Sequence, residues 1–313
     1  MASEPALRLG ARRLGISFGR RRRELSDTQF ALAIGAPVLA FLVLVVAYPL
    51  GYAVWMSLHR IIFFGGYRAV FVGLSNFQKV LADQDFWWST WVTVRITAEV
   101  VVLTMLVGLG FALVLNRRVP AGGVVRTVIC LPWCVSTYGA GLMFAYLARG
   151  QTGLGTSLAY AVGITHPVDL MTSDVVIEVL AVGAAWTMAP LVAFFLLANL
   201  KTIPRRLYDL AALDQLSPLE TFWNVTLPPL RYTLFVFTSI VTVLTMKLFD
   251  FIFVMTGGGP GETSATLTYE VYKISFKNLD LGYGAAMSFY LLFLIIGTTF
   301  LLYLVWGRRE VTR

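Results

Sequence analysis

Six apolar runs, each long enough to cross a lipid bilayer, constrain the fold of this chain more than any other feature. A helix needs about 20 apolar residues to cross the hydrocarbon core. The runs lie at about 30–58, 88–115, 122–148, 175–200, 230–256 and 283–306. Of the 313 residues, 58% are hydrophobic and only 13% are charged, about half the charged fraction of a typical soluble domain. We therefore expect an all-α, polytopic membrane protein with six transmembrane helices.

The distribution of positive charge predicts the orientation of these helices. Seventeen of the 25 Lys and Arg residues precede the first run, follow the last, or lie in loops or at the ends of runs on that same side of the membrane. Six lie in the opposite loops, and Arg95 and Lys247 lie within runs. Cytoplasmic loops carry the excess of positive charge, so we expect both termini to be cytoplasmic. The net charge of +8 then reflects topology, and a nucleic-acid partner is not expected.

This orientation divides the chain into three parts. We expect a basic cytoplasmic tail at 1–29, a six-span domain at 30–306 and a short cytoplasmic tail at 307–313. Within the six-span domain, the loop 201–229 is cytoplasmic.

The residue pattern of the loop 201–229 predicts two short helices rather than a flexible connection. Pro204 suits the start of a helix, and Leu207 and Leu210 lie on one side of the helix that follows. Such short helices are not stable alone in water. They must pack on the spans, on a partner or on lipid, and the acidic residues of the loop do not favour an anionic lipid surface.

The second short helix of the loop has a strong start signal. Ser217, Pro218 and Glu220 form the pattern of a capping box with proline at the first helical position. We expect this helix to run to about Val225 and to be stopped by Pro228 with Pro229.

This loop resembles the cytoplasmic signature loop, the EAA motif, of ATP-binding-cassette (ABC) importer permeases of the sugar type, the maltose and glycerol-phosphate group. The matching residues are Asp209-Leu210-Ala211-Ala212, Asp214-Gln215-Leu216, Phe222 and Thr226-Leu227-Pro228. Two residues depart from the family pattern: Asp209 replaces the usual Glu, and Gln215 replaces the usual turn glycine. Further segments resemble the family in order, at 71–87, 126–133, 186–190, 249–276 and 281–288.

The resemblance implies a type I importer permease fold in a bacterial or archaeal inner membrane. It implies as partners a second permease, a cytoplasmic ABC ATPase dimer and an extracytoplasmic binding protein that delivers a sugar or polyol. The chain has no ATP-binding motif, so ATP and Mg would be used by the partner ATPase, and we expect this chain to bind no cofactor or metal and to have no catalytic residues. The residues that would couple to the ATPase are Tyr208, Asp209, Ala211, Ala212, Asp214, Gln215, Ser217, Pro218, Glu220, Phe222 and Pro228.

Ionisable residues within the spans are candidates for the substrate pathway, because they are costly in a bilayer. Arg95 and Glu99 are spaced to pair with each other, and Lys247 with Asp250 would share one face of the fifth span. Aromatic rings and hydrogen-bonding groups together bind carbohydrate. The candidate pathway residues are Arg95, Glu99, Trp186, Lys247, Phe249, Asp250 and Phe253; internal packing and pairing is the competing interpretation.

The glycine-rich segment 256–264 is not a phosphate-binding loop, because it lacks the required Lys. Its residues Gly257, Gly258, Gly259 and Pro260 would contact the binding protein, or would form a plain turn. The alternative function for the whole chain is a stand-alone secondary transporter or channel, although no inverted repeat is evident. An intramembrane enzyme is not supported, since the chain has no catalytic or metal-ligand spacing.

Overall fold

The computed structural model describes residues 26–62, 66–117, 122–150, 153–166 and 169–307. Most of the two terminal tails predicted from the sequence therefore lies outside the described residues. The chain divides into two compact units, Met1–Tyr52 and Ala53–Arg313, and each is treated by itself below.

The described part of the first unit is helical from Asp27 onwards. It contains α1 (Asp27–Leu42), the π-helical turn η1 (Val43–Ala47) and the start of α2 (Tyr48–Ser57). Ser26 and Gln29 form a reciprocal capping box at the start of α1, which satisfies backbone donors that have no partner within the helix. Together these elements form one apolar helical stretch over Thr28–Ser57, as the first apolar run predicts.

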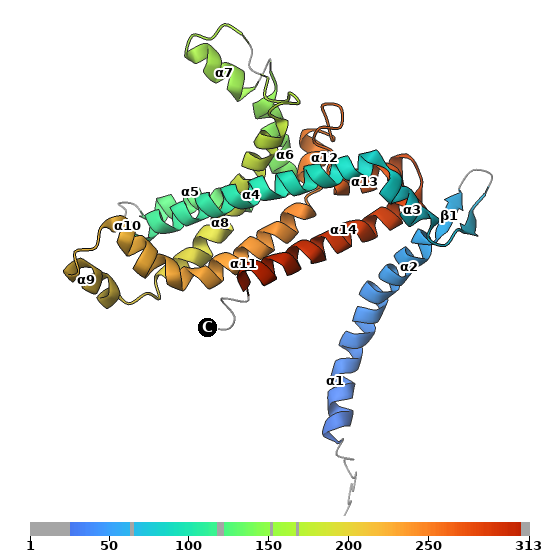
Figure 1. Ribbon diagram of the computed structural model, residues 1–313, viewed down its shortest axis with the longest axis horizontal. Coiled ribbons are helices and arrows are strands. Elements are labelled where there is room, and N and C mark those ends of the chain that lie inside the picture. The colour runs from blue at the N-terminus through green and yellow to red at the C-terminus, as the bar shows by residue number, and fades with distance from the viewer. Residues whose placement is uncertain (1–25, 63–65, 118–121, 151–152, 167–168, 308–313) are drawn as a thin grey trace, which may run out of the picture. The chain divides into compact units, whose positions relative to one another are not determined.

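The second unit is built around four long helices: α4 (Gln84–Asn116), α8 (Val176–Leu200), α11 (Leu227–Met246) and α14 (Leu281–Leu302). Figure 1 shows them side by side, with α9 and α10 at one end of the bundle and α3 and β1 at the other. The most extensive packing is between α4 and α8. Gly108 permits it, because a Cβ there would lie 2.8 Å from Cγ1 of Val192.

Two spans are interrupted near the middle of the bundle. The third run forms α5 (Gly122–Cys134) and α6 (Thr137–Ala148), which meet at 97°. The predicted single span 230–256 is wrong as one helix, because α11 ends at Met246 and α12 (Asp250–Met255) follows after a break. The described residues thus contain five helices able to span a membrane by length and composition, or six if the bent pair counts as one span.

The remaining elements connect or flank the long helices along the chain. They are a hairpin of β1 (His59–Ile62) and β2 (Arg68–Phe71), with α3 (Ser75–Ala82), α7 (Leu154–Ala161), α9 (Arg205–Leu213), α10 (Pro218–Thr221), η2 (Phe222–Thr226), α13 (Leu267–Tyr272), η3 (Lys273–Lys277) and η4 (Tyr303–Gly307). The strands pair antiparallel, with His59 opposite Phe71. The all-α expectation is confirmed, with this one hairpin as an addition that the sequence analysis missed.

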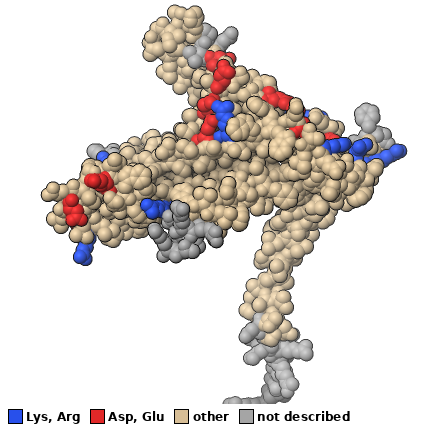
Figure 2. Space-filling view, viewed as in Figure 1, with Lys and Arg blue, Asp and Glu red and all other residues tan. Residues whose placement is uncertain are grey.

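The surface of the molecule has the character of a membrane protein. Figure 2 shows a face on which uncharged residues predominate, with Lys, Arg, Asp and Glu gathered in a few groups. Many large apolar side chains are exposed on the long helices, among them Leu106 at 64% and Phe293 at 60%. In water this exposure would be unfavourable, whereas in a bilayer these side chains meet hydrocarbon.

Candidate functional site

A pocket lies where the two helix breaks meet the middle of α8. We call it the central pocket; its volume is about 460 Å³, within the range of small-molecule sites. It is lined by Trp133, Val135, Ser136, Thr137, Thr187, Met188, Leu244, Lys247, Leu248, Phe249 and Asp250. The sequence analysis expected only three of these residues, Lys247, Phe249 and Asp250, to line a pathway.

The breaks explain why polar groups gather at this depth. Ser136 lies between α5 and α6, and its hydroxyl accepts a hydrogen bond from the Gly139 amide at 3.1 Å. Lys247 follows the last residue of α11, and Asp250 begins α12. The prediction that Lys247 and Asp250 share one helical face is therefore wrong, because no helix continues between them. Both line the pocket, and among the described residues neither forms an ion pair.

Aromatic rings continue from the central pocket along α12. Phe249 and Phe253 stack with their ring centroids 5.3 Å apart. Tyr272 of α13 contacts both, at 5.1 Å from Phe249 and 5.3 Å from Phe253. The sequence analysis missed Tyr272, although its four-residue spacing from Phe276 signals one helical face.

Three other predicted pathway residues lie elsewhere. Nε of Arg95 is 2.9 Å from Oε1 of Glu99, as their spacing predicts, and Arg95 also pairs with Glu178 of α8. Trp186 packs against Phe144, at a centroid distance of 5.7 Å, and it does not line the central pocket.

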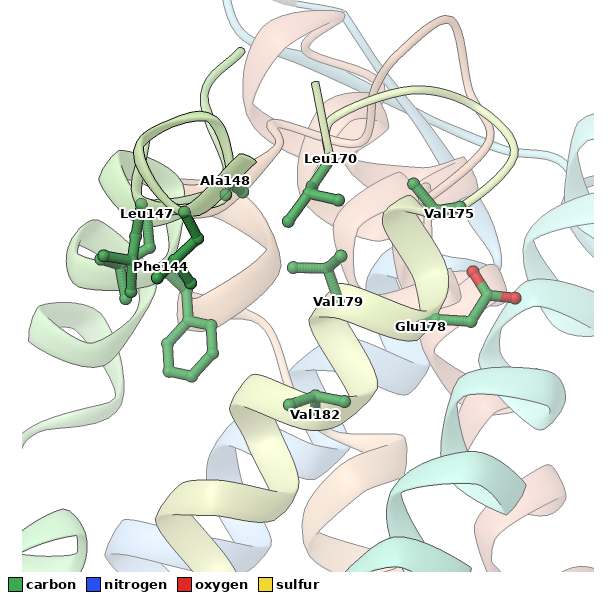
Figure 3. A pocket seen from close by; sticks show the side chains of 11 residues that line it. Phe144, Leu147, Ala148, Leu170, Val175, Glu178, Val179 and Val182 are labelled. Atoms are coloured by element: carbon green, nitrogen blue, oxygen red, sulfur yellow. The ribbon is translucent and has the colours of Figure 1, made fainter. Parts of the chain in front are cut away.

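A second cavity lies beside Glu178 and is lined almost entirely by apolar groups. This cavity of about 340 Å³ is lined mainly by apolar side chains of α6, α7 and α8. Figure 3 shows Phe144, Val179 and Val182 around it, while the carboxylate of Glu178 points away from them towards a neighbouring helix. The Glu178 carboxylate therefore pairs with Arg95 between α8 and α4 and does not make this cavity polar.

The glycine-rich segment folds into a well-defined turn. Gly257, Gly258 and Gly261 have positive φ angles of 59°, 83° and 61°, and the Gly259–Pro260 bond is cis. The hydroxyl of Ser264 donates to the carbonyl of Gly259 at 2.7 Å. A Cβ on Gly258 would lie 2.5 Å from the Tyr269 ring, so two independent constraints require glycine there.

The loop 201–229 contains the two predicted helices, joined by a tight turn. Leu216 donates its amide to the carbonyl of Ala211 at 3.0 Å, and Gln215 donates to Ala212 at 3.1 Å. These two bonds form a Schellman motif, which places Gln215 at the left-handed position that glycine usually occupies. Its φ is 54°, so the departure from the family pattern leaves the left-handed turn in place.

The capping box of the second helix is present, but its predicted end is wrong. The Ser217 amide donates to Oε2 of Glu220 at 2.8 Å, and the Glu220 amide donates to the Ser217 hydroxyl at 3.3 Å. Helix continues through Pro228 and Pro229 as one stretch, Pro218–Met246. The π-helical turn η2 precedes the prolines, and such a turn accommodates residues that cannot donate the usual backbone bond.

Side chains of α9 separate into an inward and an outward set. Ala211 is buried, and the Tyr208 hydroxyl lies 3.3 Å from Oγ1 of Thr226. Leu207, Leu210 and Leu213 are exposed at 42%, 45% and 77%. Leu207 and Leu210, which the sequence analysis expected on one side of this helix, are thus largely uncovered, and so is Leu213. The remaining predicted coupling residues are mostly exposed: Asp209, Ala212, Asp214, Gln215, Ser217, Pro218 and Glu220 are exposed, and Phe222 and Pro228 are half-buried.

Comparisons with known proteins identify relatives over most of the chain. The family model described as "Binding-protein-dependent transport system inner membrane component" matches residues 104–310. The trehalose/maltose transport system permease protein MalF of Thermococcus litoralis is 34% identical over 273 residues, covering 87% of this chain and 91% of the relative. The sn-glycerol-3-phosphate permease protein UgpA of Agrobacterium fabrum is 33% identical, covering 84% of this chain and 90% of the relative.

The fold also has a close match among solved structures. A chain of a bacterial alginate ABC transporter, in complex with an alginate pentasaccharide-bound periplasmic protein, superposes with a TM-score of 0.75. The match covers 91% of this chain and 95% of the other chain, at 15% sequence identity.

Proposed function

The chain belongs to the family of inner membrane components of binding-protein-dependent transport systems, and we propose that it is the permease subunit that forms half of the translocation pathway for a neutral saccharide or related polyol in an ABC importer. A second permease completes the pathway, a binding protein delivers the substrate, and a separate ATPase dimer hydrolyses ATP with Mg. The trehalose/maltose name of one relative supports this substrate class, whereas the sn-glycerol-3-phosphate name of the other points to a phosphorylated polyol.

The central pocket is the observation that carries the proposal. Interrupted helices near the middle of a bundle are typical of transporter sites, because unwound backbone is tolerated only where it lines a cavity. The pocket combines hydroxyl groups from Ser136, Thr137 and Thr187 with the rings of Trp133 and Phe249. Hydroxyl groups exchange hydrogen bonds with a sugar, while a ring face packs on its apolar C–H surface.

The charges of the pocket favour a neutral substrate. Lys247 and Asp250 contribute one positive and one negative charge to its lining. A phosphorylated compound would favour an excess of cations, since anion sites use several Arg or Lys donors. We therefore place a neutral saccharide ahead of a glycerol-phosphate type compound.

The exposed leucines of α9 support a docking role for the loop. Apolar side chains exposed beside acidic Asp209 and Asp214 match a groove on a protein partner better than they match an anionic lipid surface. Ala211 and Tyr208 pack inward towards the long helices, so a partner that moves Leu210 and Leu213 would move the spans with them. We assign this partner as the ATPase, which places α9 and both chain termini in the cytoplasm.

The same orientation places the glycine turn on the outer side. Its backbone is fixed by the Ser264 hydroxyl and by Trp88, whose indole donates to the carbonyl of Glu262 at 3.0 Å. This hydrogen-bonded turn, with Gly257 and Pro260 exposed, suits contact with a docked binding protein, and we assign the segment Gly257 to Pro260 this role.

The test of the proposal is ATPase activity of the complete complex in lipid nanodiscs, measured with the cognate binding protein and a panel of sugars, polyols and glycerol phosphate. We expect a neutral saccharide to stimulate hydrolysis. Replacing Asp250 with Ala should weaken this stimulation without loss of the assembled complex, because Asp250 is exposed in the pocket. Stimulation by the phosphorylated compound alone would contradict the assigned substrate class.

A further inference from the structure

Four aromatic side chains form a continuous row that begins in the central pocket and leaves it. We call this row the aromatic ladder; its members are Phe249, Phe253, Tyr272 and Phe276. Tyr272 connects it, with ring centroids 5.1 Å from Phe249, 5.3 Å from Phe253 and 5.7 Å from Phe276. Only Phe249 lines the pocket, so three of the four rings extend beyond it.

Two rings of the ladder, Phe249 and Tyr272, are half-buried against the core, and the other two are exposed. On the short helix α12, Phe251 is fully buried at 0% exposure, whereas Phe253 is 37% exposed. At the far end of the ladder, Phe276 is 68% exposed. Helix α12 therefore directs Phe251 into the core and leaves its other aromatic residue, Phe253, available for contact.

A cation beside the ladder argues against lipid as its occupant. Nζ of Lys277 lies 5.4 Å from the centroid of the Tyr269 ring and 5.8 Å from that of Tyr272, and it donates a hydrogen bond to the Tyr269 hydroxyl at 3.2 Å. In the part of the chain that the structure describes, no carboxylate pairs with Lys277. A charged ammonium group and a tyrosine hydroxyl next to exposed rings suit a ligand that carries hydroxyl groups better than they suit hydrocarbon.

We propose that the aromatic ladder is a second sugar subsite, which binds the further rings of an oligosaccharide whose first ring occupies the central pocket. The inference rests on the proposed function and narrows its substrate class to saccharides of at least two rings. The C–H face of a pyranose ring is apolar and slightly positive, so it packs on the negative face of an aromatic ring. Because Phe249 belongs to both the pocket and the ladder, a chain of linked sugars can contact them together without a gap.

The ladder also predicts the order in which an oligosaccharide contacts its rings. Phe276 is the exposed end of the ladder, and Tyr272 separates it from Phe249, the ring that lines the pocket. An incoming oligosaccharide meets this ring first and then slides from ring to ring, since stacking tolerates different sugar units. The Lys277 ammonium group supplies hydrogen bonds to hydroxyl groups at the same place.

The experiment compares Phe276→Leu with Phe276→Tyr in the complete complex, reconstituted with its binding protein. Phe293→Leu of α14 is the matched control, because Phe293 is 60% exposed and lies outside the ladder. The probes are mono-, di- and trisaccharides, and the measurements are binding-protein-stimulated ATPase activity and coupled uptake. We expect stimulation to require at least two sugar rings. We expect Phe276→Leu to reduce uptake of these sugars at least about threefold, the effect of one aromatic contact, while Phe276→Tyr and Phe293→Leu stay near wild type.

The outcomes separate this inference from the function on which it rests. Stimulation by monosaccharides or polyols alone, or wild-type uptake by Phe276→Leu, would overturn the second subsite and leave the permease role intact. An equal loss in Phe276→Leu and Phe293→Leu would also overturn it, because the effect would then come from general damage. Absence of stimulation by every sugar would overturn the proposed substrate class itself.

Discussion

Replacing Gln215 with Gly should stabilise the turn between α9 and α10. Gln215 has φ of 54°, a left-handed conformation that costs a residue with a Cβ roughly 1–2 kcal/mol. Glycine avoids this cost but loses about 0.5–1 kcal/mol more on ordering, because its unfolded chain has more freedom. The expected net gain is about 0.5–1 kcal/mol, or roughly a two- to fivefold shift in the local opening equilibrium.

Hydrogen exchange of the Leu216 amide measures this gain directly. That amide bonds to the carbonyl of Ala211 at 3.0 Å, so it exchanges only when the turn opens. We expect protection, corrected for intrinsic rates, to rise two- to fivefold in Gln215→Gly. Gln215→Ala is the control, since alanine retains the Cβ and should give no gain.

An increase of the same size in Gln215→Ala would refute this reasoning, because it would show that loss of the Gln side chain, and not relief of the left-handed backbone, stabilises the turn. Unchanged protection in Gln215→Gly would refute it as well. The test also bears on the family resemblance, since it shows whether the glycine usual at this position stabilises the left-handed turn.

Two further predictions concern packing and pH. Gly183→Ala should lower the thermal unfolding midpoint, because its Cβ would lie 2.4 Å from the Phe251 ring and overpacking costs about 1–3 kcal/mol. Gly297→Ala is the control: no atom lies within 4 Å of its Cβ, so this variant should not lower the midpoint. Burial raises the pKa of the Glu270 carboxyl, and Lys273 opposes this effect. The stability that this raised pKa contributes is present below the unfolded pKa of about 4.3 and is lost as pH rises through the folded value. As pH rises from the unfolded to the folded pKa of Glu270, the thermal unfolding midpoint should therefore fall less in Glu270→Gln than in wild type. An equal fall in the two proteins would contradict the raised pKa of Glu270.

Sequence alone predicts a largely helical membrane chain, because this class depends on a simple property, the length of the apolar runs. The capping box at Ser217 was equally predictable, since the pattern is local and its geometry is fixed. The end of that helix was not, because Pro228 and Pro229 normally stop a helix, and only the π-helical turn before them allows it to continue. Such a turn has no distinct sequence pattern.

The central pocket could be predicted only in part. Lys247, Phe249 and Asp250 stand out because charge and aromatic residues are conspicuous in an apolar run. Ser136 and Thr187 do not, because hydroxyl side chains are common in transmembrane helices and usually bond to their own backbone. They meet the charged residues only because two breaks, far apart in the sequence, lie at the same level of α8.

Uptake of a saccharide into proteoliposomes tests the central claim most directly. The reconstituted complex would contain this chain, its partner permease and the ATPase, with the binding protein added outside. We predict uptake that requires both ATP and the binding protein, and that is lost in Leu213→Asp although the chain still inserts, because Leu213 is the most exposed leucine of α9. Uptake of the same sugar by this chain alone, without ATPase or binding protein, would contradict the account and favour a stand-alone transporter.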